Sequence, residues 1–176
     1  MPISTIGSDS LASSSVTRPK IGYAGAVLQV VNSILTSKVT TTSSSFVDTG
    51  LSVSITPTFA SSKFLITISG TAGIGSNGLD RVYFLVTGMT STNVGDAGAG
   101  GTRCTSVVNP RSADTGWAQS AIDIKIMDTP ATTSTRTYSL QWKTNSSYPA
   151  ALNSAYNNDA LVANTPATMT VMEIAA

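Results

Sequence analysis

Apolar and polar residues alternate along much of this chain, most clearly in LSVSITPTFASSKFLITISG, residues 51–70. Apolar residues occupy every second position in two runs, 51–55 and 64–68, which are separated by a turn. Because successive side chains of a strand point to opposite faces, this pattern is typical of strands with one buried face. We therefore predict two strands joined as a β-hairpin. Their expected core residues include Ile55, Phe64 and Ile66.

A second pair of alternating runs lies closer to the C-terminus. SAIDIKIMDTP, residues 120–130, places isoleucine at every second position of its central part, and TYSLQWKT, residues 137–144, alternates large apolar with polar residues. We predict two further strands, joined by a turn that contains Pro130, with Leu140 and Trp142 in the core.

Three other segments have strand character. Residues 26–39, AVLQVVNSILTSKV, are rich in β-branched residues, and the terminal MTVMEIAA, residues 169–176, alternates again. Residues 81–89, RVYFLVTGM, are apolar on both faces, which is typical of a strand covered on each side, in a sandwich or at a subunit contact. The segments between these strands read as loops: two glycine-rich stretches, 70–78 and 94–102, and an asparagine-rich connection, 145–166.

The pattern as a whole predicts an all-β fold. No segment combines a 3.6-residue apolar period with helix caps, and seven or eight strands separated by turn signals are typical of a β-sandwich or jelly-roll-like domain. Charged residues make up 11% of the chain, less than half the usual share of about 25%, and serine and threonine supply the polarity instead. A length of 176 residues favours one domain, over residues 23–176, with residues 1–22 as an extended N-terminal arm.

Charge and hydropathy exclude several kinds of partner. The net charge is +1 without a basic cluster, so we expect no binding to nucleic acid or to a membrane surface. No apolar run approaches the roughly 18 residues of a membrane span, and no secretory signal is recognisable at the N-terminus. We expect synthesis and folding in a cytoplasm.

The residue types of common catalytic and metal sites are scarce. The chain contains no histidine, which excludes Ser-His-Asp and Cys-His nucleophile systems and histidine-containing zinc sites. Cys104 is the single cysteine, and the carboxylates are scattered over separate segments. Glu173 lies in the apolar last strand, where we expect a structural ion pair with Arg81 or Arg136, or an exposed edge position. We predict no catalytic residues, no metal site and no cofactor.

Two sets of residues remain as candidates for interactions. The arm carries apolar side chains that could lie in grooves on a partner, and basic ones that could meet acidic groups: Ile3, Ile6, Leu11, Arg18 and Lys20. Three aromatic residues occur in polar, loop-like settings, where an aromatic ring either stacks on a sugar or fills a subunit contact: Trp117, Tyr148 and Tyr156.

The order of several short segments resembles a β-sandwich module of virion structural proteins in tailed bacteriophages, including phages of cyanobacteria. The segments are AVLQVVNS, ITPT-x-x-SSK at 55–63, D-x-P-A-T-x-S-x-x-T-Y at 128–138 and MEI-A at 172–175, and the opening MPISTIGSDSLA resembles the leader of phage proteins that dock on a virion scaffold. The resemblance covers about residues 25–176. It implies a surface-exposed, typically trimeric virion component, and it brings no catalytic motif.

These observations favour a homotrimeric decoration, or cement, protein on a phage capsid. We expect it at the virion surface, made in the host cytoplasm and anchored to the major capsid protein by the N-terminal arm. The alternatives are a short tail-fibre or tail-tip module that contacts a host surface glycan, and a separate lectin-like binding domain. The absence of a shaft of repeats or a coiled-coil pattern favours decoration.

Overall fold

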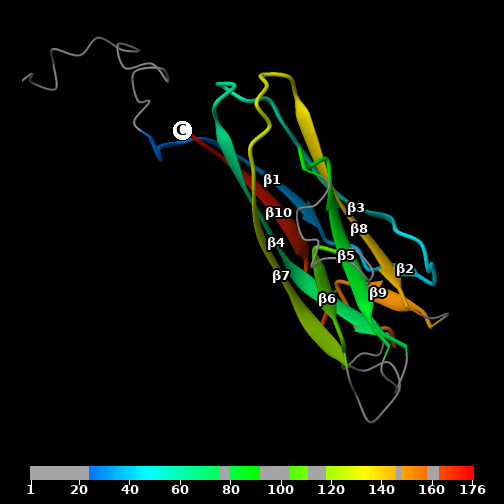
Figure 1. Cartoon of the computed structure of the whole chain (residues 1–176). Coiled ribbons are helices and arrows are strands. Elements are labelled where there is room, and N and C mark those ends of the chain that lie inside the picture. The colour runs from blue at the N-terminus through cyan, green and yellow to red at the C-terminus, as the bar shows by residue number, and fades with distance from the viewer. Residues whose placement is uncertain (1–23, 76–79, 92–103, 111–117, 146–147, 158–162) are drawn as a thin grey trace, which may run out of the picture.

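Ten strands form two antiparallel sheets in a computed structural model that describes residues 24–75, 80–91, 104–110, 118–145, 148–157 and 163–176. Figure 1 shows the two layers packed face to face as a β-sandwich, which confirms the predicted all-β class. No helix occurs among the described residues. The expected arm, residues 1–22, lies outside them. In chain order, the strands are β1 (Val27–Leu35), β2 (Val39–Thr41), β3 (Val47–Ile55), β4 (Lys63–Ile74), β5 (Val82–Thr87), β6 (Ser106–Val108), β7 (Gln119–Asp128), β8 (Arg136–Thr144), β9 (Ala150–Leu152) and β10 (Ala167–Ile174).

The larger sheet has six strands, arranged around β4. One edge of β4 pairs with β10 and then with the short β9, and its other edge pairs with β7. Strand β1 extends the sheet beyond β10, and β2 extends it beyond β9. The smaller sheet has the order β3-β8-β5-β6.

The predicted hairpin over residues 51–70 is wrong in its pairing. Strands β3 and β4 occur where expected, but β3 pairs with β8 in the four-stranded sheet and β4 belongs to the six-stranded sheet. The connection of seven residues, 56–62, crosses from one sheet to the other. Stacked sheets lie about 10 Å apart, a distance that seven residues can span and a two-residue hairpin turn cannot. The two strands therefore bury their apolar faces against each other across the interior.

The second predicted pair of strands occurs as β7 and β8, joined by the turn that contains Pro130, but the two strands do not pair with each other. Strand β7 pairs with β4 and strand β8 pairs with β3 and β5, so the turn that contains Pro130 also crosses between the sheets. Figure 1 shows both crossing turns at the same end of the sandwich. They contact each other there, since the Thr56 and Thr135 hydroxyl oxygens lie 2.7 Å apart.

The alternation correctly predicted the core. The expected residues Ile55, Phe64, Ile66, Leu140 and Trp142 are at most 2% exposed. One aromatic pair links the two sheets: the Phe64 ring on β4 meets the Tyr138 ring on β8 edge-on, with centroids 6.1 Å apart. A second pair lies within the smaller sheet, where Phe84 on β5 stacks on Trp142 on β8 with centroids 6.3 Å apart.

Two of the predicted loops contain strand. The glycine-rich stretch 70–78 begins inside β4, and the asparagine-rich connection 145–166 contains β9. At Gly73, an added Cβ would lie 2.7 Å from the Cα of Ala155 and 2.9 Å from the Ser154 carbonyl oxygen. Glycine is therefore required in this strand because another backbone segment passes directly over it.

Candidate functional site

Glu173 is buried at the end of the sandwich where the two crossing turns lie. Its side chain points from β10 toward the 56–62 turn, where it accepts hydrogen bonds from the Thr58 backbone amide at 2.6 Å, the Thr58 hydroxyl at 2.9 Å and the Ser62 hydroxyl at 2.6 Å. The Gln29 side-chain amide donates a further bond at 2.5 Å from β1. The expected ion pair with Arg81 or Arg136 is wrong, because backbone and hydroxyl donors of the turn satisfy the carboxylate instead.

These contacts govern the ionisation of Glu173. Burial opposes the charged form, but the hydrogen bonds from Ser62, Gln29 and Thr58 outweigh it and hold the pKa of the carboxyl below its ordinary value of 4.5. The group is thus ionised at neutral pH, with donors on both of its oxygens. The carboxylate therefore binds the 56–62 turn in its charged form.

Asp128, the last residue of β7, is a second buried carboxylate, and its donors lie outside the turn that follows it. It is 4% exposed and accepts hydrogen bonds from the Thr90 backbone amide at 3.0 Å, the Thr90 hydroxyl at 3.1 Å and the Tyr138 hydroxyl at 2.8 Å. The Arg136 guanidinium lies 4.0 Å away. Burial, together with the bond to Asp128, raises the pKa of Tyr138, so this phenol stays neutral and donates a hydrogen bond to the Asp128 carboxylate.

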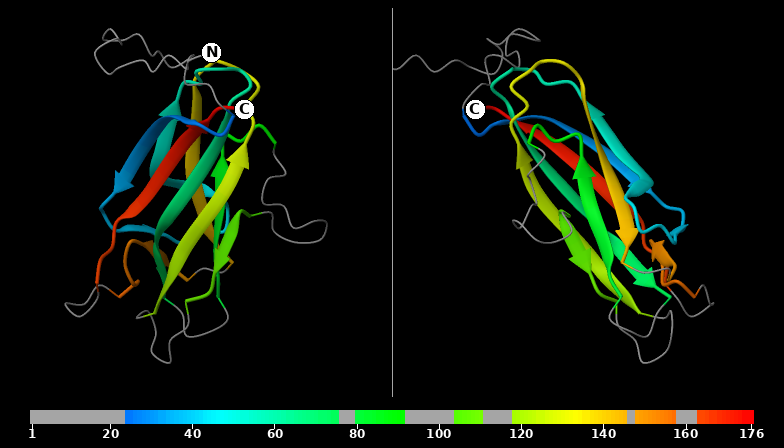
Figure 2. Two further views of the ribbon diagram at one scale, coloured as in Figure 1. Left: turned by 90° about the vertical axis from the view of Figure 1, so that its left-hand side faces the viewer. Right: turned by 45° about the vertical axis from the view of Figure 1, so that its right-hand side comes forward.

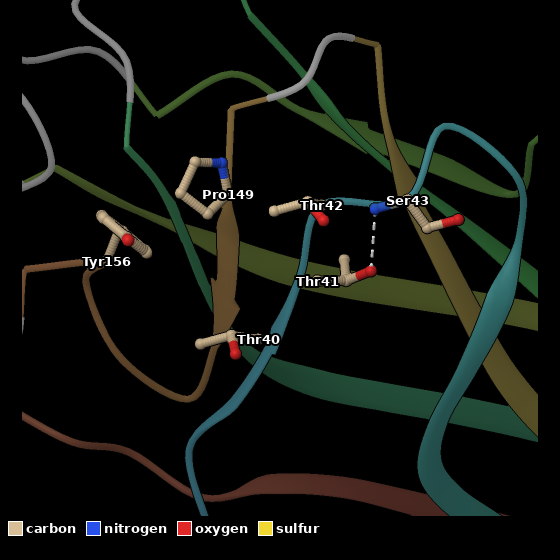
Figure 3. Close-up of a pocket in the computed structure, with 6 residues that line it drawn as sticks. All are labelled: Thr40, Thr41, Thr42, Ser43, Pro149 and Tyr156. Carbon is tan, nitrogen blue, oxygen red and sulfur yellow. Dashed lines mark hydrogen bonds between the residues drawn. The ribbon is translucent and has the colours of Figure 1, made fainter.

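A polar hollow of about 480 Å³ opens beside β2, in the part of the sandwich where β2 pairs with β9. Its size falls within the range of small-ligand pockets, about 300–1,000 Å³. Figure 3 shows one wall formed by the segment 40–43 and the other formed by Pro149 and Tyr156. The walls therefore combine hydroxyl groups with one aromatic ring.

The Tyr156 ring is held in place by its surroundings. Gly75 lies directly against it, since a Cβ added at that glycine would be 2.7 Å from the ring. The Lys38 ammonium donates to the Tyr156 carbonyl oxygen at 2.6 Å and lies 5.8 Å from the ring centroid. A fixed ring beside hydroxyl groups offers the stacking and hydrogen-bonding surface that a neutral sugar uses.

The structure locates two of the predicted interaction residues. Tyr156 lines the hollow, and Tyr148, next to Pro149, is 48% exposed. Trp117 and the five arm residues, Ile3, Ile6, Leu11, Arg18 and Lys20, lie outside the described residues. Sequence reasoning missed the 40–43 wall, because a TTTS run has the same composition as any polar linker. Its one signal is the position of this run directly after a β-branched segment.

The described residues contain no group of three cysteine or acidic side chains that could hold a metal ion. Cys104 is half-buried, and this burial raises the pKa of its thiol against the opposing effect of Lys143. Over the same residues, no helix has the length and apolar character needed to cross a membrane.

Comparisons with known proteins add no family to this description. No protein-family model matches the chain, and no curated protein matches it.

Proposed function

We propose that this chain is a non-enzymatic structural protein of the virion surface of a tailed phage, a homotrimeric capsid decoration protein. In this proposal the β-sandwich is the exposed body, and residues 1–22 anchor it to the major capsid protein. The support is the resemblance of the segment order, together with the way the two buried carboxylates are used. Glu173 accepts hydrogen bonds from the 56–62 turn and from β1, and Asp128 accepts them from Thr90 and Tyr138. Each carboxylate therefore links segments that are far apart in the chain, as is typical of a rigid scaffold.

One observation carries the proposal furthest. Three of the most exposed large apolar side chains lie on a single strand, β1: Val27, Val30 and Ile34, at 54%, 55% and 59%. This strand directly follows the N-terminal segment, and its start is bonded to the C-terminus, with the Gly25 amide donating to the Ala175 carbonyl oxygen at 2.8 Å. Exposed apolar surface on a sheet edge favours a role in an assembly.

The test is the location and copy number of the protein on purified virions. Labelling with gold-conjugated antibody and quantitative mass spectrometry should find hundreds of copies, distributed over the head. A few copies to a few dozen, confined to the tail, would refute decoration and favour the tail module.

The hollow favours a second candidate function, contact with a host surface glycan. The observation behind it is the combination of the fixed Tyr156 ring with the hydroxyl-rich 40–43 wall. Saturation-transfer NMR with a panel of free neutral saccharides tests it. Thr42→Val, which removes one hydroxyl at the hollow, should weaken a detected signal, and Thr133→Val in the exposed turn between β7 and β8 is the matched control. No signal from any saccharide in the panel would count against this function.

A further inference from the structure

A row of apolar side chains crosses the outer face of the six-stranded sheet. Val30 on β1 lies opposite Met172 on β10, Met172 lies opposite Leu65 on β4, and Leu65 lies opposite Met127 on β7. We call these four residues the apolar row. The neighbouring positions along the same strands point into the core, as the burial of Val171 shows.

The apolar row is accessible from outside. Val30 is 55% exposed and Met127 is 45% exposed, and Leu65 and Met172 between them are half-buried. Figure 2 (left) shows β1, β10, β4 and β7 side by side, in blue, red, green and yellow-green, with no described strand lying over them. The next row on one side is polar and consists of Asn32, Thr170, Thr67 and Lys125, and the next row on the other side contains Val27, Ile174 and Lys63.

The outer face of the four-stranded sheet is different. Its β3 and β8 positions are mostly serine and threonine, such as Ser52 opposite Ser139 and Ser54 opposite Thr137. Strand β5, which sequence alone singled out as apolar on both faces, is half-buried on its outer side, and the Lys143 ammonium covers the Tyr83 ring at 5.6 Å. Among the described residues, the three most exposed large apolar side chains, Val27, Val30 and Ile34, all lie on the other sheet.

We propose that copies of this chain associate through the apolar row, around a rotation axis that runs roughly along the strands. The proposal rests on the homotrimer of the proposed function and names the surface that forms its subunit contact. Rotation about such an axis does not change the position of a residue along the axis, so equivalent residues of all copies lie at the same height. The apolar row of one subunit then meets the apolar row of the next, with Val30 at one end of the row brought toward Met127 at the other.

The size of this face is compatible with a second copy. Four strands spaced about 4.8 Å apart, each with about eight residues of about 3.3 Å rise, give a flat area of about 500 Å². The accessible surface follows the contours of the side chains and is therefore larger than this flat area. It approaches the roughly 800 Å² that each partner contributes to a stable interface.

Charge also favours association of this face with itself. Of the described residues that point outward from β1, β10, β4 and β7, three are charged: Lys63, Asp123 and Lys125. The Lys125 ammonium is already paired with the Asp123 carboxylate at 2.9 Å. Copies that meet at the apolar row therefore bring few uncompensated charges together.

The test compares two matched substitutions in the full-length chain. Leu65→Lys places a charge in the centre of the apolar row, and Leu85→Lys places the same charge on the outer face of the four-stranded sheet. Sedimentation velocity and light scattering over a micromolar concentration range should show that the parent and Leu85→Lys are trimers and that Leu65→Lys is a folded monomer. We expect the dissociation constant to rise about 30-fold or more, as for the loss of an interface hot spot. Circular dichroism verifies the fold.

The outcomes separate this inference from the function on which it rests. A folded Leu65→Lys protein that remains trimeric overturns the assignment of the face and leaves the trimer intact. A parent dimer that Leu65→Lys dissociates supports the face and refutes the trimer, whereas a monomeric parent refutes both. If Leu65→Lys does not fold, two substitutions on exposed edge strands replace it as the test. Val30→Lys on β1 should dissociate the assembly, and Val107→Lys on β6, where the valine is 48% exposed, should not.

Discussion

The Glu173 carboxylate accepts a hydrogen bond of 2.6 Å from the backbone amide of Thr58, a residue 115 positions earlier in the chain. This contact joins the last strand of the six-stranded sheet to the turn that leaves the four-stranded sheet. The two sheets are thus tied together by a buried polar group as well as by the apolar core. A buried carboxylate with several donors is costly to disturb, because removing its charge leaves those donors without a full partner.

Glu173→Gln should lower the free energy of unfolding by about 2–4 kcal/mol at neutral pH, since one acceptor oxygen becomes a donor amide facing donors. Urea denaturation measures the change. Asp123→Asn, at an exposed carboxylate paired with Lys125, is the control and should change stability by less than about 1 kcal/mol. Equal effects of the two substitutions would contradict the anchoring role of Glu173.

The lowered pKa of Glu173 predicts an acid dependence of stability. The folded state favours the ionised carboxylate, so its contribution is fully present above the ordinary pKa of 4.5 and is lost as the pH falls through the lower folded-state value. Urea midpoints measured from pH 7 to pH 3 should show the gap between the parent and Glu173→Gln narrowing on the acid side. A gap that stays constant over this range would argue against the linkage.

Tyr138→Phe should destabilise the fold by about 1–2 kcal/mol, because the phenol donates to the buried Asp128 carboxylate at 2.8 Å. The raised pKa of Tyr138 adds an alkaline dependence: the neutral phenol stabilises the fold below pH 10, and this contribution is lost as the pH rises further. Absorbance titration near 295 nm should show a tyrosine that ionises only as the protein unfolds, and Tyr138→Phe should remove this late step.

Trp142→Ala should cost about 3–5 kcal/mol of unfolding free energy, since the indole is fully buried and stacks on Phe84. Thermal and urea unfolding measure the loss. The neighbouring Gln141→Ala points away from the core and should change stability by less than about 1 kcal/mol. A Trp142→Ala protein that melts like the parent would show that the strand register is wrong.

Deletion of residues 1–22 should leave a folded trimer that no longer coats capsids. The segment has too little apolar content to build a core of its own, so its anchoring depends on the partner. Purified full-length and deleted proteins are added to heads that lack this protein, and bound copies are counted. Ile3→Ser and Leu11→Ser should weaken docking at any salt concentration, and neutralisation of Arg18 and Lys20 should weaken it most at low salt. Equal coating by the deleted trimer would contradict the anchoring role.

The sequence by itself determined the strands and which side of each strand is buried. Period-two alternation is a local property, and it correctly marked Ile55, Phe64 and Trp142 as core residues. It also indicated an all-β domain, because few charged residues and many serines and threonines suit strands and turns better than exposed helix faces.

Only the tertiary structure decided which strands pair. Alternation shows that β3 and β4 each have one apolar face, but two such strands bury it equally well side by side in one sheet or facing each other from two sheets. The seven-residue turn permits the second arrangement, and Glu173 holds that turn from a strand more than a hundred residues away. The apolar row arises in the same way. No local pattern in the sequence connects its four members, Val30, Leu65, Met127 and Met172. They become neighbours on one face of the sheet only because four strands from distant parts of the chain pair in this register.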